Sequence, residues 1–213
     1  MPQARIKVFL FDLGNVLVDF DFTPAITRIS NFCDKKPDEI LKFFFSSELV
    51  PIFEKGGISS REFYKQLKNK LALKLGYESF VHIWNEVFYF SKKNRAVYHV
   101  VNCLRKKYRL GLLSNTNILH YGYIKNNYPV LNVFEKIFLS FEIGALKPDK
   151  AIYQKAIKDL GVLPENIFYT DDRADLVESA SALGIKSFVF TSQGKLIKDI
   201  SSLGVLLDEQ RQP

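Results

Sequence analysis

The sequence from Ile6 to Asp21 reads IKVFLFDLGNVLVDFD. Its apolar run at positions 8–11 is typical of a strand buried on both faces of a parallel sheet. Asp12 ends this run, and Gly14 follows two residues later. A carboxylate at the end of a buried strand costs free energy unless it has a use, and open α/β sheets bind ligands at the carboxyl ends of their strands. Asp12 is therefore predicted to be a reactive or metal-binding group, and the alternative is an ordinary turn aspartate before Gly14.

The second part of the chain predicts an α/β fold. Short apolar strands, separated by amphipathic helices, are predicted at 110–114, 136–140, 167–170 and 186–190. This alternation indicates a doubly wound parallel sheet with helices on both faces.

The block between the first strand and residue 90 has helical periodicity and no strand pattern. Its last predicted helix, 77–90, is rich in aromatic residues. We expect residues 21–90 to form an inserted, all-helical cap subdomain over an α/β core made of residues 1–20 and 91–213.

Composition narrows the class of protein. The chain has 213 residues, 47% of them hydrophobic, and a formal net charge of +7. The basic run from Lys92 to Arg109 predicts a solvated helix face, and it lacks the interleaved aromatic residues of a nucleic-acid site.

No apolar run reaches the roughly 20 residues of a membrane span, and no signal peptide is expected. Cys33 and Cys103 lack metal-ligand spacing, which predicts reduced thiols in a cytoplasmic protein.

Polar groups follow three of the predicted strands. Asp12 ends the first strand, Ser114-Asn115 ends another, and Asp171-Asp172 ends a third, while a loop supplies Lys147. The carboxyl ends of parallel strands share one edge of a sheet, so we expect these groups around one crevice. Carboxylates from separate strands suit Mg²⁺, and a hydroxyl and a lysine beside them suit a phosphoryl group. A carboxylate nucleophile can accept that group as an aspartyl-phosphate.

The same residues carry a resemblance to a known family. The segments FDLGNV, LSNT, KP and YTDDRAD, in this order, resemble the four motifs of the haloacid dehalogenase superfamily, and the resemblance covers nearly the full length of the chain. The residues of these motifs are most similar to those of a bacterial branch of the superfamily. That branch has a small helical cap and includes phosphatases that act on glucose 1-phosphate. The resemblance implies a Rossmann-like core, Mg²⁺ as cofactor and a small phosphorylated metabolite as substrate.

Roles at the centre of the site follow from the resemblance. It implies that Asp12 is the nucleophile and a Mg²⁺ ligand, that the backbone carbonyl of Gly14 is a second ligand, and that Asp171 is a third. Ser114 and the backbone of Asn115 would bind the phosphoryl oxygens. Lys147 would neutralise charge near Asp12.

Supporting roles are implied in the same way. Asp172 would hold metal-bound water or Lys147, and Asp175 would support the site from one helical turn further on. Glu54, Lys55 and Ile58 stand beside the turn through which caps of this branch reach the substrate, so they are candidate substrate contacts. An ordinary helix-end turn is the alternative for these three residues.

Gly14 departs from the family pattern. Most phosphatases of the family carry a second aspartate there as general acid and base, whose loss costs about 10²–10⁴-fold on a poor leaving group. A good leaving group needs less help, so we expect a sugar phosphate such as a hexose 1-phosphate. Asp19 or Asp21 is an alternative acid, although both are more typical of helix caps or surface groups.

Two rival functions remain open from the sequence. A metal-independent 2-haloacid dehalogenase also attacks with an aspartate, but that branch usually lacks the paired carboxylates Asp171-Asp172. A phosphate-binding protein without turnover is the other rival, because Gly14 is no acid. We expect no nucleic-acid or membrane partner, and a monomer or weak homodimer.

Overall fold

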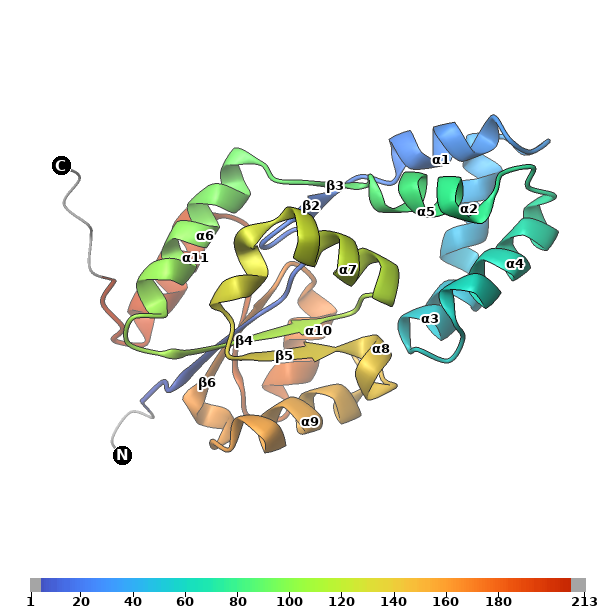
Figure 1. Cartoon of the computed structure of the whole chain (residues 1–213). Helices are drawn as coiled ribbons and strands as arrows, with labels where there is room; N and C mark the ends of the chain where they lie inside the picture. Colours follow the sequence, from blue (N-terminus) through green and yellow to red (C-terminus); the bar gives the residue numbers. More distant parts are fainter. Residues whose placement is uncertain (1–4, 208–213) are drawn as a thin grey trace.

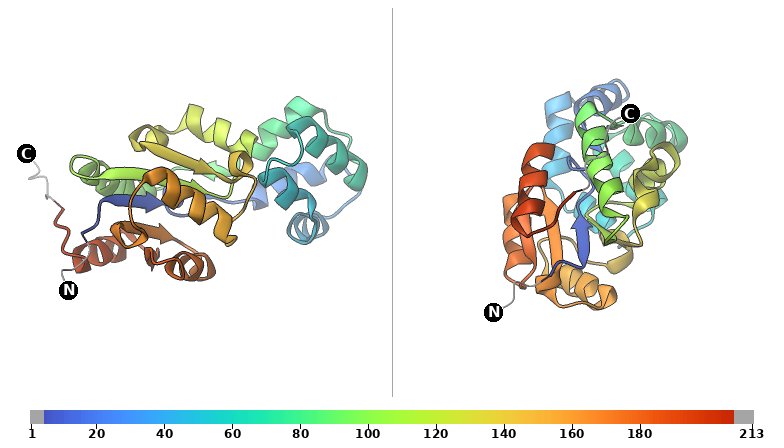
Figure 2. Two further views of the ribbon diagram at one scale, coloured as in Figure 1. Left: turned by 90° about the horizontal axis from the view of Figure 1, so that it is seen from below. Right: turned by 90° about the vertical axis from the view of Figure 1, so that its left-hand side faces the viewer.

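The computed structural model describes residues 5–207 (Figure 1). A parallel sheet with helices on both faces forms one part, and the helices α1–α5, here called the helical unit, form the other. The strands point toward the helical unit, as the left view of Figure 2 shows. The predicted core began at residue 1 and ended at residue 213, and its ends, 1–4 and 208–213, lie outside the described residues.

The strands are β1 Val8–Phe11, β2 Asp19–Phe20, β3 Phe88–Tyr89, β4 Arg109–Ser114, β5 Lys136–Leu139, β6 Ile167–Asp171 and β7 Lys186–Val189. The helices are α1 Thr23–Ser30, α2 Pro37–Ser46, α3 Leu49–Glu54, α4 Ser60–Leu71, α5 Tyr77–Asn85, α6 Lys92–Leu104, α7 Ile118–Asn127, α8 Ser140–Ile143, α9 Lys150–Leu160, α10 Ala174–Ser181 and α11 Gln193–Ser202, with short 3-10 turns at Pro129–Val133 and Pro164–Asn166. None of the helices within residues 5–207 is long and apolar enough to cross a membrane.

The main sheet has the strand order β5-β4-β1-β6-β7, and all its pairings are parallel. The predicted doubly wound α/β fold is therefore confirmed. The chain leaves β1 toward β4 and β5 on one side and returns to β6 and β7 on the other, so β1 lies at the switch in strand order. That is where an open sheet has its ligand crevice.

Alternate side chains of β1 face opposite layers of helices. Phe9 and Phe11 belong to one hydrophobic cluster, together with residues of α6, α7 and α11. Val8 and Leu10 belong to the other, together with residues of α9 and α10. Since all four residues are fully buried, the strand has apolar residues at every position, as a strand covered on both faces requires.

The helical unit has a hydrophobic cluster of its own, in which Trp84, Phe63 and Phe80 pack together. A short antiparallel ribbon of β2 and β3 joins it to the sheet. We expected helix through residue 90 and no strand in this block, and that was wrong, because α5 ends at Asn85 and β3 follows. A strand of two residues has no periodicity, and it exists only through its pairing with a distant partner.

The turn after α3 brings the helical unit into contact with the core. Gly56 has a φ of +72°, and a Cβ placed there would lie 2.2 Å from the backbone oxygen of Phe141. A side chain at this position is therefore excluded both by the left-handed backbone and by the close approach of α8.

We expect Gly56→Ala to lower the free energy of unfolding by about 1–3 kcal/mol, because the left-handed conformation and the overlap with α8 both cost free energy. Gly122→Ala is the control, since Gly122 lies inside α7 with nothing within 4 Å of a Cβ. The control should stabilise the protein by up to about 1 kcal/mol. Urea unfolding measures both, and the interpretation fails if the two variants change stability in the same direction.

Candidate active site

Three carboxylates meet where β1 and β6 end. Asp12, Asp171 and Asp172 each offer an oxygen, and these oxygens all lie within 4.8 Å of one another. The register explains this, because Phe11 pairs with Thr170 and so the next residues of the two strands, Asp12 and Asp171, emerge side by side. The crevice predicted from the strand ends is therefore present in the structure.

The ammonium of Lys147 lies between two of these carboxylates. Its Nζ is 2.6 Å from an oxygen of Asp12 and 2.6 Å from an oxygen of Asp171. It also donates to the backbone oxygen of Leu113 at 3.1 Å and to the hydroxyl of Tyr169 at 3.2 Å. Lys147 is 3% exposed, so its charge is compensated almost wholly by the protein.

The loop that carries Lys147 is held by Asn115. The side chain of Asn115 accepts from the backbone N–H of Lys147 at 2.8 Å and donates to its backbone oxygen at 2.9 Å. Ser114, at the end of β4, is 2% exposed, and Ser114, Asn115 and Gly14 line one small hollow of about 100 Å³. The structure thus places Asn115 against Lys147, and Ser114 beside Asn115 in the same hollow.

Burial and charge set the protonation of these groups. Burial raises the pKa of Asp12 to about 7, aided by the charge of Asp171 and opposed by Lys147. Burial alone would lower the pKa of Lys147, but Asp12 and Asp171 raise it instead. The pKa of Asp172 is raised, mainly by burial. An additional cation beside the carboxylates would favour their ionised forms.

The three carboxylates fit a hard divalent cation. They supply oxygen ligands only, from the ends of two strands, and they lie close enough together to share one ion. Mg²⁺ takes one or two protein carboxylates together with water and phosphate oxygens. The chain therefore has the donor set that the predicted cofactor requires.

The two predicted supporting aspartates differ in their surroundings. Asp172 accepts a hydrogen bond from the side chain of Asn15 at 3.0 Å. Of the two roles implied for Asp172, holding metal-bound water or holding Lys147, the second is supported by no hydrogen bond or ion pair within residues 5–207, since the ammonium is paired with Asp12 and Asp171, and the first stays a prediction. Asp175 is exposed and forms a 2.6 Å ion pair with Arg173.

The three candidate substrate contacts of the helical unit also differ in their surroundings. Glu54 lines the cleft of about 310 Å³ that contains Asp12 and Lys147. Ile58 packs against the hydrophobic cluster of the helical unit, and Lys55 is exposed. The structure therefore brings Glu54 to the carboxylate cluster, and places Ile58 in the packing of the helical unit.

Asp19 and Asp21, the alternative acids, have other partners. Asp19 forms a 2.5 Å ion pair with Lys93 and accepts from Asn94. Asp21 is exposed and accepts from the backbone N–H of Thr23 at 2.8 Å, at the start of α1. Asp21 is therefore a surface group, as the sequence favoured, whereas Asp19 is neither a helix cap nor a surface group, since it is buried in β2.

Sequence reasoning missed Asn15, Arg173 and Tyr169. The hydroxyl of Tyr169 donates to Asp171, and Arg173 lines the cleft beside Asp172. Tyr169 had a signal, since it precedes Asp171 by two residues in a strand and side chains two apart share a face. Asn15 and Arg173 had none, because their positions depend on the course of loops.

Three comparisons place the chain among known proteins. The family described as haloacid dehalogenase-like hydrolase matches residues 6–184. D-ribitol-5-phosphate phosphatase of Bacteroides thetaiotaomicron is 28% identical over 189 residues, which cover 86% of this chain and 91% of that protein. The solved structure of a family enzyme from Bacteroides thetaiotaomicron in complex with magnesium and inorganic phosphate is 27% identical with a TM-score of 0.77, over 88% of this chain and 95% of that one. A predicted hydrolase of the same type from Porphyromonas gingivalis is 26% identical with a TM-score of 0.77, over 95% of this chain and 100% of that one.

We expect Lys147→Met to lower the free energy of unfolding by about 3–5 kcal/mol, since it leaves two buried carboxylates without their cation. Lys155→Met is the control, because Lys155 pairs with Asp159 on the exposed face of α9 and such pairs contribute about 0.5 kcal/mol or less. Denaturant unfolding with and without a divalent cation measures both. The cation should restore part of the loss only in Lys147→Met, and equal losses in the two variants would contradict this assignment.

Proposed function

The chain belongs to the haloacid dehalogenase-like hydrolases and is an enzyme of the phosphatase type, and we propose that it hydrolyses a small phosphomonoester in two steps through Asp12. The observation that carries this proposal is the meeting of Asp12, Asp171 and Lys147 at one edge of the sheet. Relatives with magnesium and phosphate in their structures support Mg²⁺ as the cofactor.

Asp12 is the nucleophile in this proposal. One of its carboxylate oxygens forms a bond to phosphorus while the bond from phosphorus to the leaving alcohol oxygen breaks. Water then attacks the phosphorus of the resulting aspartyl-phosphate, which releases phosphate and restores Asp12. Asp12, Asp171 and the backbone carbonyl of Gly14 would hold Mg²⁺, which when bound would neutralise charge on the phosphoryl oxygens.

The remaining residues orient the phosphoryl group. The hydroxyl of Ser114 and the backbone N–H of Asn115 would donate to its oxygens, and the ammonium of Lys147 would balance its charge. Asn115 contributes further by holding the backbone of Lys147 at both its N–H and its carbonyl. Asp172 would hold water on the metal side, and Asp175 would orient Arg173 at the rim of the cleft.

We propose that the helical unit, residues 21–90, is a cap that selects the alcohol part of the substrate. Its residue Glu54 lines the same cleft as Asp12. A sugar phosphate is the substrate class we favour. The anomeric oxygen of a hexose 1-phosphate is a good leaving group and departs from phosphorus with little help, whereas the primary alkoxide of a sugar-alcohol 5-phosphate needs a proton donor that Gly14 does not supply.

We expect Mg²⁺-dependent phosphate release from a panel of glucose 1-phosphate, ribitol 5-phosphate, nucleotides and acetyl phosphate. Asp12→Asn should abolish it, because an amide is a poor nucleophile, and EDTA should abolish it in the native protein. Asp159→Asn is the control, as Asp159 is exposed on α9. A phosphate assay measures all of these reactions.

Two outcomes would contradict the proposal. Binding of Mg²⁺ and phosphate without turnover of any ester would identify a phosphate-binding protein. Activity on a 2-haloacid that survives EDTA would identify a dehalogenase.

A further inference from the structure

Glu54 is held against the core at its backbone. It is the last residue of α3, and its carbonyl accepts a 2.7 Å hydrogen bond from the hydroxyl of Ser140. The same hydroxyl accepts from the backbone N–H of Thr116 at 2.9 Å, directly after the predicted phosphate-binding residues. The backbone of Glu54 is thereby tied to the end of β4, even though the residue belongs to the helical unit.

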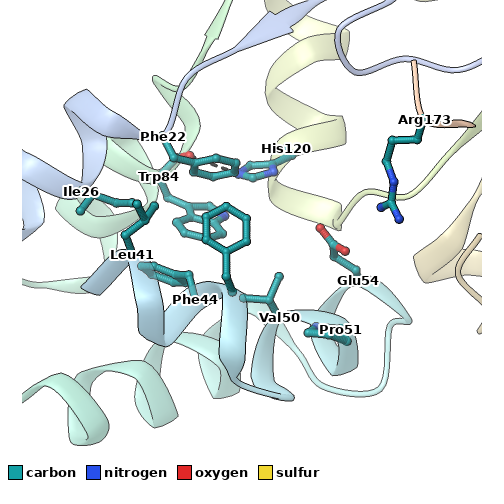
Figure 3. Close-up of a pocket in the computed structure, with 11 residues that line it drawn as sticks. Phe22, Ile26, Leu41, Phe44, Val50, Pro51, Glu54, Trp84, His120 and Arg173 are labelled. Carbon is teal, nitrogen blue, oxygen red and sulfur yellow. Dashed lines mark hydrogen bonds between the residues drawn. The ribbon is translucent and has the colours of Figure 1, made fainter. Parts of the chain in front are cut away.

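The carboxylate of Glu54, in contrast, has no hydrogen bond or ion pair to any residue within 5–207. It stands where three hollows meet, since Glu54 lines the cleft with Asp12, the small hollow with Ser114, and a cavity of about 320 Å³ between the helical unit and the core. Figure 3 shows the carboxylate directed into the open space between His120 and Arg173. This is the boundary between the phosphoryl site and the space available to a leaving group.

The surroundings of Glu54 are apolar on the side of the helical unit. Phe22, Phe44, Val50 and Pro51 line the cavity beside it (Figure 3). Burial raises the pKa of Glu54 to about 7, so a large fraction of the carboxyl groups carry a proton at neutral pH. Environments of this kind produce the general acids of other hydrolases.

The charged groups that share the cleft with Glu54 are Asp12, Lys147, Asp171, Asp172 and Arg173. Each has a partner of its own, as described above. His120, which also lines the cavity, is not a competing acid, because its ring nitrogens contact Trp84 and Asn117 and burial lowers its pKa to about 3.

Position 14 carries no acid, and the ring of Phe20 occupies the space beside it. A Cβ on Gly14 would lie 2.9 Å from the ring of Phe20 and 3.9 Å from an oxygen of Asp12. A carboxyl at this position would have to displace the aromatic ring. The proton donor for the leaving group must therefore reach the cleft from another wall.

We propose that Glu54 is the general acid and base of the reaction, supplied by the helical unit in place of a residue at position 14. In the first step the bond between phosphorus and the leaving oxygen breaks, and that oxygen takes its proton from the Glu54 carboxyl. In the second step the Glu54 carboxylate accepts a proton from the water that attacks the aspartyl-phosphate. The two steps restore Glu54 and add one water across the ester.

This inference rests on the proposed function and widens it. With a proton donor in the cleft, the enzyme acts on alkyl phosphates of sugars and sugar alcohols as well as on hexose 1-phosphates. Good leaving groups are then accepted but not required.

The test is Glu54→Gln, measured on a series of aryl and alkyl phosphates whose alcohols span a wide range of pKa. The native enzyme should show a shallow dependence of kcat/KM on that pKa. The variant should lose about 10²–10⁴-fold on alkyl phosphates and little on p-nitrophenyl phosphate, whose leaving group needs no proton. It should also release a burst of p-nitrophenol, since water attack on the aspartyl-phosphate is slowed.

Glu48→Gln is the matched control, because Glu48 is exposed at the start of the same helix and should leave all rates unchanged. An equal loss on every ester, or no loss on alkyl phosphates, would overturn the assignment of Glu54. Turnover of p-nitrophenyl phosphate by native protein but not by Asp12→Asn confirms the proposed function independently, so failure of one proposal is distinguishable from failure of the other. Mg²⁺ and phosphate binding by Glu54→Gln verifies that the variant is folded.

Discussion

The buried ammonium of Lys147 between Asp12 and Asp171 is the interaction on which the site depends. Two carboxylates that emerge side by side from adjacent strands repel each other, and burial adds a desolvation cost. A single ammonium, 2.6 Å from each, offsets part of that cost, and burial still leaves the pKa of Asp12 raised to about 7. Negative charge from the three carboxylates remains for a bound cation to neutralise, and the carboxylates and the lysine are already in place, so little rearrangement is needed when the substrate arrives.

The placement of Lys147 depends in turn on the backbone. The lysine comes from a loop, and loops do not by themselves fix a side chain to within a few tenths of an ångström. Asn115 supplies the missing constraint by bonding to both the N–H and the carbonyl of Lys147. Because Asn115 directly follows β4, the rigidity of the sheet is transferred to the loop. The same side chain thus explains why an amide, and not another polar group, follows Ser114.

The sequence was sufficient to predict the groups at the strand ends. Asp12, Ser114 and Asp171 each follow an apolar run, and parallel pairing necessarily brings such positions to one edge. The bonds from Asn15 to Asp172 and from Ser140 to Glu54 could not be predicted this way, because each joins two loops or termini whose paths carry no periodicity. The ribbon of β2 and β3 was missed for a related reason, since two residues are too few to show alternation.

The position of the helical unit on the core also depends on contacts that the sequence pattern does not reveal. Its hydrophobic cluster makes it stable as a unit, but apolar contacts have no preferred orientation. Two hydrogen bonds fix the orientation of the helical unit on the core: the hydroxyl of Ser140 bonds to the carbonyl of Glu54, and the ring of His120 bonds to the carbonyl of Trp84. The first contact involves a residue of the cleft, and the second lies at the 320 Å³ cavity that Glu54 also lines. Gly14 provides no proton donor beside Asp12, where the ring of Phe20 lies. Because these hydrogen bonds orient the helical unit on the core, the chemistry can be divided between the two parts, with the nucleophile on the rigid sheet and the proposed proton donor on the helical unit.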